Sequence, residues 1–296
     1  MKIDRILMPT DFSETANHAL DQAIYLAVEH DAELVVLHAR VMYEDDPSKI
    51  ANKMMDLDEI EKRLNNEIKV KLQKHENIRF KHSIVKGYSA PSAILGYLND
   101  NPFDLVVIGT HGRTGIGHFL IGSVAEKIVR YAPCPVLTIN RNFIFDRAFT
   151  KMLVPFDFSD HARLALETAL SFTTSQNAEL NLLYVVDKDV HPALYAWGMK
   201  SIFDVIPDIR EKAKKRMDEV IAEIKNSKKV KINKRVVEGI PSKEIAKFVT
   251  DNDIDLIVMA THGLVGLDRF LLGSTTEKVI RSVDRPILSL KLERVI

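Results

Sequence analysis

The chain has 296 residues, about twice the length of a typical domain, so two domains are the first expectation. Lys and Arg together number 41, as do Asp and Glu, and the zero net charge gives no electrostatic reason to expect nucleic acid or an anionic membrane as a main partner. A single cysteine, Cys134, excludes an internal disulfide and is typical of a reducing cytoplasm, and the apolar runs are far shorter than the roughly 20 residues that cross a bilayer. We therefore expect a cytoplasmic protein of two domains.

Strands and helices alternate along the first half of the chain. Short apolar runs predict strands at Ile3–Met8, Glu33–Ala39, Arg79–Val85, Asp104–Ile108 and Pro135–Ile139. Apolar residues at helical spacing predict a helix that begins after Ser13, an N-cap residue type, and further helices at Asp56–His75, Ser89–Asn99 and Ser123–Tyr131. Nearly unbroken apolar strands between helices indicate an open parallel sheet of five strands covered on both faces, which is a doubly wound, Rossmann-like α/β fold. Such sheets bind ligands beyond the carboxyl ends of their strands, where the strand order reverses.

The second half of the chain repeats the first. The segment RILMPTDFS at Arg5–Ser13 returns as KMLVPFDFS at Lys151–Ser159. The segments Asp104–Lys127 and Asp255–Lys278 align over 24 residues without a gap and share 13 identities. Because several separated blocks recur in the same order, the sequence predicts a duplication of one domain, with the copies at residues 1–142 and 148–296.

A glycine pattern follows the strand predicted at Asp104–Ile108. It reads Gly109-x2-Gly112-x9-Gly122-Ser123. Glycine lets the backbone adopt positive φ and lets a phosphate approach it closely. Loop N–H groups and the free amides at the start of the helix at Ser123 would point toward the same place, where the helix dipole favours an anion. The recurrence of the pattern in the second copy predicts phosphate binding, with tight turns that need glycine as the alternative.

This glycine pattern resembles the signature of the ATP-binding branch of the universal stress protein family. PTDFS at Pro9–Ser13 is also similar to the first strand–helix junction of that family, and VVLHARV at Val35–Val41 to its second strand. The resemblance covers nearly the whole chain as two tandem domains of the adenine nucleotide alpha hydrolase-like type. It implies that Asp11 and Asp157 contact the nucleoside and that backbone at Val41 and about Val186 holds adenine. It also implies phosphates on the glycine-rich loops, bridged by Mg²⁺ or Mn²⁺ with few protein ligands.

The resemblance is carried onto this chain position by position. The nucleotide-binding positions implied in the first copy are Pro9, Thr10, Asp11, Val41, Ile108, Gly109, His111, Gly112, Arg113, Gly122, Ser123 and Val124. Those implied in the second copy are Pro155, Phe156, Asp157, Val186, Met259, Ala260, His262, Gly263, Gly273, Ser274, Thr275 and Thr276. The two aspartates have an alternative role as acids that complement a helix dipole, and the two histidines as loop residues that hydrogen-bond backbone. No catalytic residue and no protein metal ligand is assigned.

The second copy departs from the glycine pattern. Ala260 stands where the first glycine is expected, and an alanine there is tolerated at little cost only if the native φ is negative. Phe156 replaces Thr10 before the aspartate, Leu264 replaces Arg113 in the loop, and Thr276 adds a hydroxyl. We expect ATP binding by the first copy and leave the second open.

Three functions remain as alternatives at this point. The first is a nucleotide-dependent regulatory or stress-response protein. The second is an enzyme, either an ATPase or a nucleotidyl transferase on a related sheet. Neither loop has the Gly-Lys-Ser/Thr of a P-loop, and the first strand does not end in an SGG-x-DS pyrophosphate loop, so we expect at most slow ATP hydrolysis. The third is a structural pairing module without nucleotide. The family resemblance implies pairing through the last strands, here Pro135–Ile139 and Pro286–Leu290, as an internal pseudo-dimer, and leaves a further homodimer open.

Overall fold

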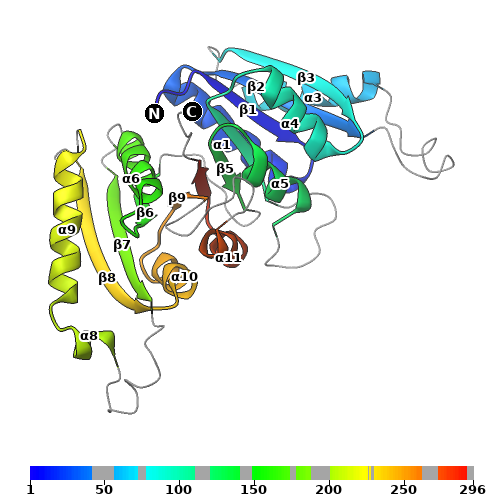
Figure 1. Cartoon of the computed structure of the whole chain (residues 1–296). Helices are drawn as coiled ribbons and strands as arrows, with labels where there is room; N and C mark the ends of the chain where they lie inside the picture. The colour runs from blue at the N-terminus through cyan, green and yellow to red at the C-terminus, as the bar shows by residue number, and fades with distance from the viewer. Residues whose placement is uncertain are drawn as a thin grey trace. The chain divides into compact units, whose positions relative to one another are not determined.

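The computed structural model divides the chain into two compact units, Lys2–Arg147 and Ala148–Ile296, which we name the first and the second domain (Figure 1). The residues that the structure describes are 1–41, 57–72, 78–110, 121–140, 149–173, 178–187, 201–225, 227, 230–261 and 273–291. None of the helices in these ranges is both long enough and apolar enough to cross a membrane.

Strands and helices alternate strictly in the first domain. Its strands are β1 (Arg5–Thr10), β2 (Glu33–Val41), β3 (Phe80–Gly87), β4 (Leu105–Gly109) and β5 (Val136–Ile139). Its helices are α1 (Glu14–His30), α3 (Leu57–Leu72), α4 (Ala90–Asp100) and α5 (Ser123–Tyr131). The local sequence explains the helix boundaries: Ser13 caps α1, which ends at Asp31 in the left-handed conformation, and Ser89 with Ser92 forms a capping box on α4.

The second domain repeats this order. Its strands are β6 (Lys151–Pro155), β7 (Glu179–Asp187), β8 (Lys231–Gly239), β9 (Leu256–Ala260) and β10 (Ile287–Leu290). Its helices are α6 (Asp160–Thr173), the single turn α8 (Ile202–Val205), α9 (Ile209–Glu223), α10 (Pro241–Asp251) and α11 (Ser274–Ser282). The short helix α8 precedes α9, and the corresponding stretch before α3, residues 42–56, lies outside the described residues.

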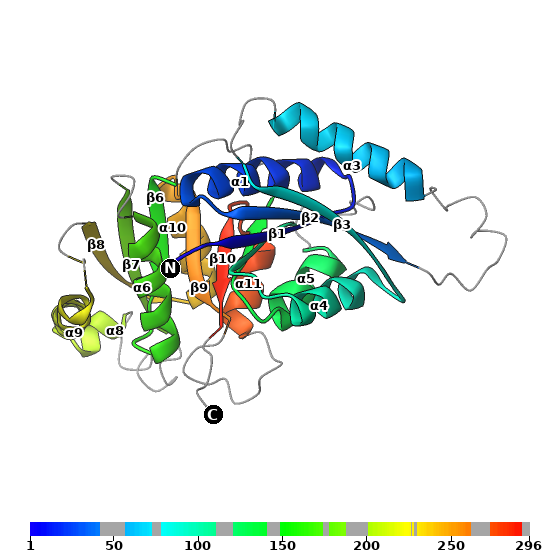
Figure 2. The same cartoon turned by 90° about the horizontal axis from the view of Figure 1, so that it is seen from above.

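Each domain has a parallel sheet whose strand order reverses at its first strand. The order is β3-β2-β1-β4-β5 in the first domain and β8-β7-β6-β9-β10 in the second. The strand β1 therefore lies between β2 and β4, with Leu7 level with Val106, and this is the switch point of a doubly wound sheet. Figure 2 shows α1 and α3 on one face of the first sheet and α4 and α5 on the other. These observations confirm the expected α/β class and the two five-stranded sheets.

Most of the strands predicted for the first domain end one or two residues before the strands of the structure. The first strand, expected at Ile3–Met8, lies at Arg5–Thr10, because its parallel pairing with β2 begins at Arg5 opposite Glu33 and continues to Thr10. The other strands of the first domain also end as expected or one or two residues later, and the long amphipathic helix expected at Asp56–His75 is described over Leu57–Leu72. Because β1 continues to Thr10, the turn that follows the strand begins at Asp11.

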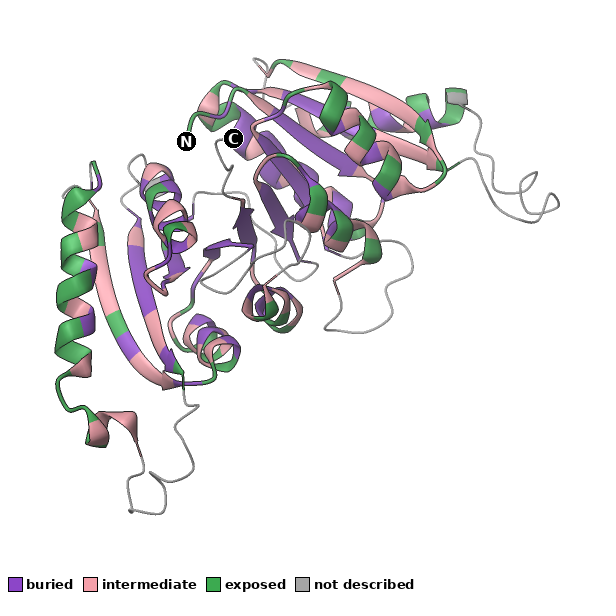
Figure 3. Ribbon diagram, viewed as in Figure 1, coloured by how far each residue is buried: buried purple, intermediate pink, exposed green. Residues whose placement is uncertain are grey.

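The central strands carry the core of each domain. Leu7 in β1 and Leu153 in β6 are both fully buried, and Figure 3 shows buried residues along the strands with exposed residues on the outer faces of the helices. A strand that is buried on both faces has no alternation of polar and apolar residues, as the sequence of β1 and β4 indicated.

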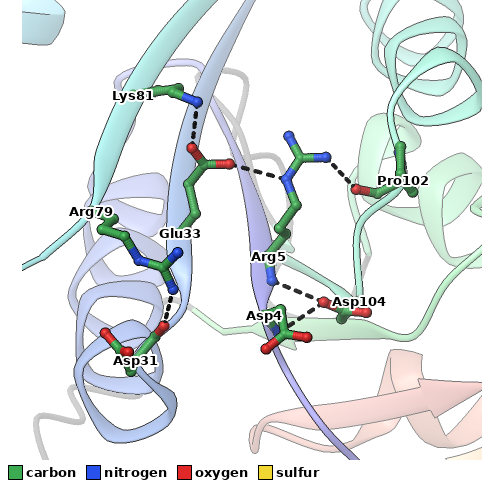
Figure 4. A network of polar contacts seen from close by, with 8 residues as sticks. All are labelled: Asp4, Arg5, Asp31, Glu33, Arg79, Lys81, Pro102 and Asp104. Carbon is green, nitrogen blue, oxygen red and sulfur yellow. Dashed lines mark hydrogen bonds and ion pairs between the residues drawn. The ribbon is translucent and has the colours of Figure 1, made fainter.

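A carboxylate holds the amino ends of the strands together in each domain, and we call it the amino-end lock. Asp104 Oδ2 accepts hydrogen bonds from the backbone N–H groups of Asp4 and Arg5, both at 2.8 Å (Figure 4). Asp255 accepts from the N–H and the hydroxyl of Thr150 and from the N–H of Lys151. The lock ties β4 to β1, and β9 to β6, at the end of the sheet away from the switch-point loops.

Candidate functional site

The described candidate residues lie in four segments at the carboxyl ends of β1, β2 and β4 and the first turn of α5, and at the equivalent places of the second domain. Segments that follow neighbouring parallel strands meet at one edge of the sheet, and β1 and β4 are neighbours. His111, Gly112, Arg113, His262 and Gly263 lie outside the described residues.

A sharp turn follows β1. Phe12 has a φ of 63°, in the left-handed region that residues with a Cβ rarely adopt. Asp11 Oδ1 accepts a hydrogen bond from the Ser13 N–H at 3.0 Å, and the Phe12 N–H donates to Thr10 Oγ1 at 3.1 Å. Ser13 Oγ then accepts from the Ala16 N–H and caps α1. The turn fixes the position of the Asp11 carboxylate at the carboxyl end of β1.

The second domain has the same turn after β6. Phe158 has a φ of 64°, and Asp157 Oδ1 accepts from the Ser159 N–H at 3.0 Å and from its hydroxyl at 2.5 Å. Ser159 Oγ accepts from the Ala162 N–H. Phe156 stands where the first domain has Thr10 and is buried, so this turn has no side-chain hydroxyl at that position.

Main-chain hydrogen bonds close the base of the glycine-rich loop. The Gly122 N–H donates to the Thr110 carbonyl at 2.5 Å, and the Thr110 N–H donates to the Ile139 carbonyl at 2.9 Å. In the second domain the Gly273 N–H donates to the Thr261 carbonyl at 2.7 Å, and the Thr261 N–H to Leu290 at 2.8 Å. We call the bond between the two ends of each loop the loop clamp. It places the start of α5 beside the end of β4.

The helix after each loop begins without a side-chain cap. Gly122 and Gly273 are the N-cap residues of α5 and α11, and neither can supply a capping oxygen. By contrast, α1 and α4 of the first domain are capped by serine hydroxyls. Ser123 and Ser274 are exposed in the first turn. The first N–H groups of α5 and α11 can thus donate to an anion, which the positive end of the helix dipole also favours.

The described glycines of the loops do not have positive φ. Gly122 has a φ of −61° and Gly273 of −56°, and neither Gly109 nor Ala260 is among the described residues with positive φ. Of the two reasons for glycine, positive φ therefore does not apply at these positions, and the alanine at 260 carries no strain from it. A Cβ on Gly109 would lie 2.9 Å from Thr15 Cγ2, which makes this glycine a close-approach position between β4 and α1.

Thr276 lies at the loop of the second domain but faces inward. Its side chain is buried, and its hydroxyl donates to the Ala260 carbonyl at 3.0 Å. The first domain has Ala125 and Gly109 at these two places, so it lacks this bond. The contact ties the first turn of α11 directly to the end of β9. A role for Thr276 as a nucleotide ligand stays a prediction.

The two valines proposed to lie near adenine are at the carboxyl ends of β2 in the first sheet and of β7 in the second. Val41 is the last residue of β2, about half exposed, and its register partner in β3 is Gly87. Val186 pairs with Glu238 of β8 and is buried. Their backbone groups lie at the carboxyl edge of the sheet, on the other side of β1 and β6 from the loop clamps.

Two arginines near the turns were missed by the sequence reasoning. The guanidinium of Arg63 in α3 lies over the Phe12 ring, and that of Arg216 in α9 lies over the Phe158 ring. Both helices are distant in sequence from the turns, and no local motif marks either arginine. The repeated Phe of the DFS segment was the available signal. Within the described ranges, no three His, Cys, Asp or Glu residues are grouped so that they could hold a metal ion.

The repeated sheet, turn and loop clamp define a tandem pair of doubly wound α/β domains with one candidate site in each. A model of the Universal stress protein family matches residues 2–140 and again residues 148–291, and the chain belongs to this family.

Individual relatives agree with this assignment. Universal stress protein MJ0577 of Methanocaldococcus jannaschii is 34% identical over 155 residues, which cover 48% of this chain and 95% of that protein. Universal stress protein Slr1230 of Synechocystis is 22% identical over 97% of this chain and 99% of its own length. The crystal structure of a universal stress protein from Archaeoglobus fulgidus matches 98% of this chain and 99% of its own, with a TM-score of 0.71 and 21% identity, and so has the same fold.

Proposed function

We propose that this chain is a nucleotide-dependent regulatory protein that binds ATP at the carboxyl edge of each sheet. The observation that carries the proposal is the pairing of β1 with β4, because it brings the Asp11 turn and the loop clamp to one edge. The triphosphate would lie on the uncapped start of α5, and adenine near the end of β2. Mg²⁺ or Mn²⁺ would bind through the phosphates, and we assign no catalytic residue.

The first domain is the stronger site in this proposal. It has the full glycine pattern, and its turn is supported by the Thr10 hydroxyl, whereas the second domain has Phe156 and Ala260 at these places. We further propose a cytoplasmic location and, from the family resemblance, an internal pairing of the domains through β5 and β10. ATP can act as a regulator only if it binds one conformation more tightly than another.

The test is to purify the protein without added nucleotide, denature it, and identify and count the released nucleotide by mass spectrometry. We expect one to two ATP molecules per chain. The Gly122→Val variant should release less ATP than the Gly273→Val variant. Both glycines have φ and ψ values that valine can adopt, so the substitutions fill space at the helix start without straining the backbone. A protein that is isolated empty and takes up no added ATP with Mg²⁺ would leave a structural pairing module as the better account.

A further inference from the structure

The left-handed phenylalanine of the first domain lies in a stack of three side chains. The Arg63 guanidinium carbon is 4.4 Å from the centre of the Phe12 ring. The His38 ring of β2 is stacked on Phe12 with the centroids 4.8 Å apart, and His38 Nδ1 donates to the Thr10 carbonyl at 2.9 Å. Helix α3, strand β2 and the turn after β1 therefore meet at Phe12. We name Arg63, Phe12 and His38 the ring stack of the first domain.

The second domain has an equivalent stack built from a different aromatic residue. The Arg216 guanidinium carbon is 4.6 Å from the centre of the Phe158 ring. Tyr184 of β7 occupies the place of His38 and meets Phe158 edge-on at 4.9 Å, and Phe156 meets it edge-on at 5.1 Å. The arginine, the left-handed phenylalanine and an aromatic residue of the second strand thus recur together, although α3 and α9 have different sequences.

A phenylalanine at positive φ is strained, and its surroundings must hold it there. In both domains the left-handed conformation of Phe12 or Phe158 turns the chain. The carboxylate before it can then accept a hydrogen bond from the N–H of the serine after it. A cation over an aromatic face is attracted by the ring quadrupole and keeps the ring in place. The arginine therefore acts on the carboxylate through the phenylalanine between them.

We propose that Arg63 and Arg216 are positioning residues for the nucleotide-binding carboxylates of Asp11 and Asp157. This inference rests on the proposed ATP binding and extends it to α3 and α9. It makes nucleotide affinity depend on the docking of these helices, which begin well after the strands that end at Val41 and Asp187. A movement of α3 or α9 would change the affinity without touching the ligand.

The test measures ATP affinity with Mg²⁺ by isothermal titration calorimetry in the full chain carrying Gly273→Val, so that the first site is observed alone. We expect Arg63→Met to weaken ATP binding about fivefold to tenfold, and Arg63→Lys, which keeps a cation for the ring, to stay within about threefold of the parent. The matched control is Arg5→Met, because the Arg5 guanidinium lies over Phe103 at a similar 4.5 Å but at the amino end of β1. That variant should lose thermal stability and keep its affinity within about twofold.

A double-mutant cycle with Asp11→Asn separates positioning from general loosening. If Arg63 acts through Asp11, Arg63→Met should change the affinity by less than about twofold once Asp11 is already asparagine. Equal effects in both backgrounds, or an unchanged affinity in the Asp11 parent, would overturn the positioning role while ATP binding itself stands. No ATP binding by the unsubstituted chain would overturn the proposed function, and this inference with it.

Discussion

The sites of the two domains have the same backbone conformation at the turn and the same loop clamp, and they differ in the side chains next to these features. The turns have φ values of 63° at Phe12 and 64° at Phe158, and both loops are closed by the same main-chain clamp. Among the described residues of the two sites, the differences lie in side chains beside the turn and beneath the loop. The first domain has a hydroxyl beside the turn at Thr10, whereas the second has one beneath the loop at Thr276. The comparison teaches that the backbone frame was kept after duplication while the polar contacts around it were redistributed.

The largest expected effects should be equal in the two domains, because they concern the shared frame. Leu7 and Leu153 occupy the same place in β1 and β6, and both are fully buried. We expect Leu7→Ala and Leu153→Ala each to lower the free energy of unfolding by about 3 kcal/mol, measured by urea denaturation followed by circular dichroism. Val28→Ala, at a half-exposed position of α1, is the control and should change it by less than about 0.5 kcal/mol. Clearly different losses of unfolding free energy for the two variants would show that the cores of the two domains are not equivalent.

The next effect distinguishes the two loops at their first position. Gly109→Ala puts a Cβ 2.9 Å from Thr15 Cγ2 and 3.0 Å from the Thr15 carbonyl carbon, so we expect it to lower the stability by about 1 to 2 kcal/mol. The reverse change, Ala260→Gly, should lower it by less than about 1 kcal/mol. Adding Thr15→Ser removes the methyl group and should restore about half of the loss. Thermal unfolding measures all three, and an unaffected Gly109→Ala protein would show that α1 and β4 separate easily.

The bond beneath the second loop gives a smaller effect. Thr276→Val removes the hydroxyl that donates to Ala260 and should lower the stability by about 1 kcal/mol. The converse substitution, Ala125→Thr, supplies a hydroxyl near the Gly109 carbonyl and should be neutral to within about 0.5 kcal/mol. ATP titration of the same variants sharpens the result. If Thr276→Val lowers the free energy of ATP binding by more than it lowers the free energy of unfolding, Thr276 contacts the nucleotide instead.

The smallest effect concerns pH and the amino ends of the strands. The Lys81 ammonium, followed by Arg5, holds the pKa of Glu33 below its ordinary value, and Lys231 does the same to the pKa of Glu179. A carboxylate whose pKa is lower in the folded state stabilises the protein above its unfolded pKa, and this stability is lost as the pH falls through the folded pKa. Glu33→Gln and Glu179→Gln should therefore destabilise the protein at about pH 7 and have little effect at about pH 3. Because two cations bond Glu33 and one bonds Glu179, the Glu33 effect should be larger; equal pH profiles would contradict this.

The repeat and the apolar runs allowed the two parallel sheets and their doubly wound strand order to be predicted, and they placed the candidate residues at the carboxyl ends of the strands. The details that escaped prediction depend on contacts between distant segments. The end of β1 at Thr10 follows from its register with β2, the need for glycine at 109 follows from the approach of Thr15, and the inward turn of Thr276 follows from the Ala260 carbonyl. Arg63 and Arg216 lie on helices whose own pattern only indicates amphipathicity. The repeated Phe of the DFS segment marks one partner of each contact, but no sequence pattern marks the arginine.

The loop clamp also has a consequence for how such a chain can change. Main-chain atoms of Thr110 and Gly122 join the two ends of the first loop, and those of Thr261 and Gly273 join the ends of its copy, so this closure does not use the side chains of these four residues. Loops with joined ends tolerate substitution and insertion well. We therefore expect the sequence between the joined ends, residues 111–121 and 262–272, to be replaceable in one copy without loss of the clamp in the other. One half of a tandem gene could exchange its ligand preference with a relative while the other half keeps its own.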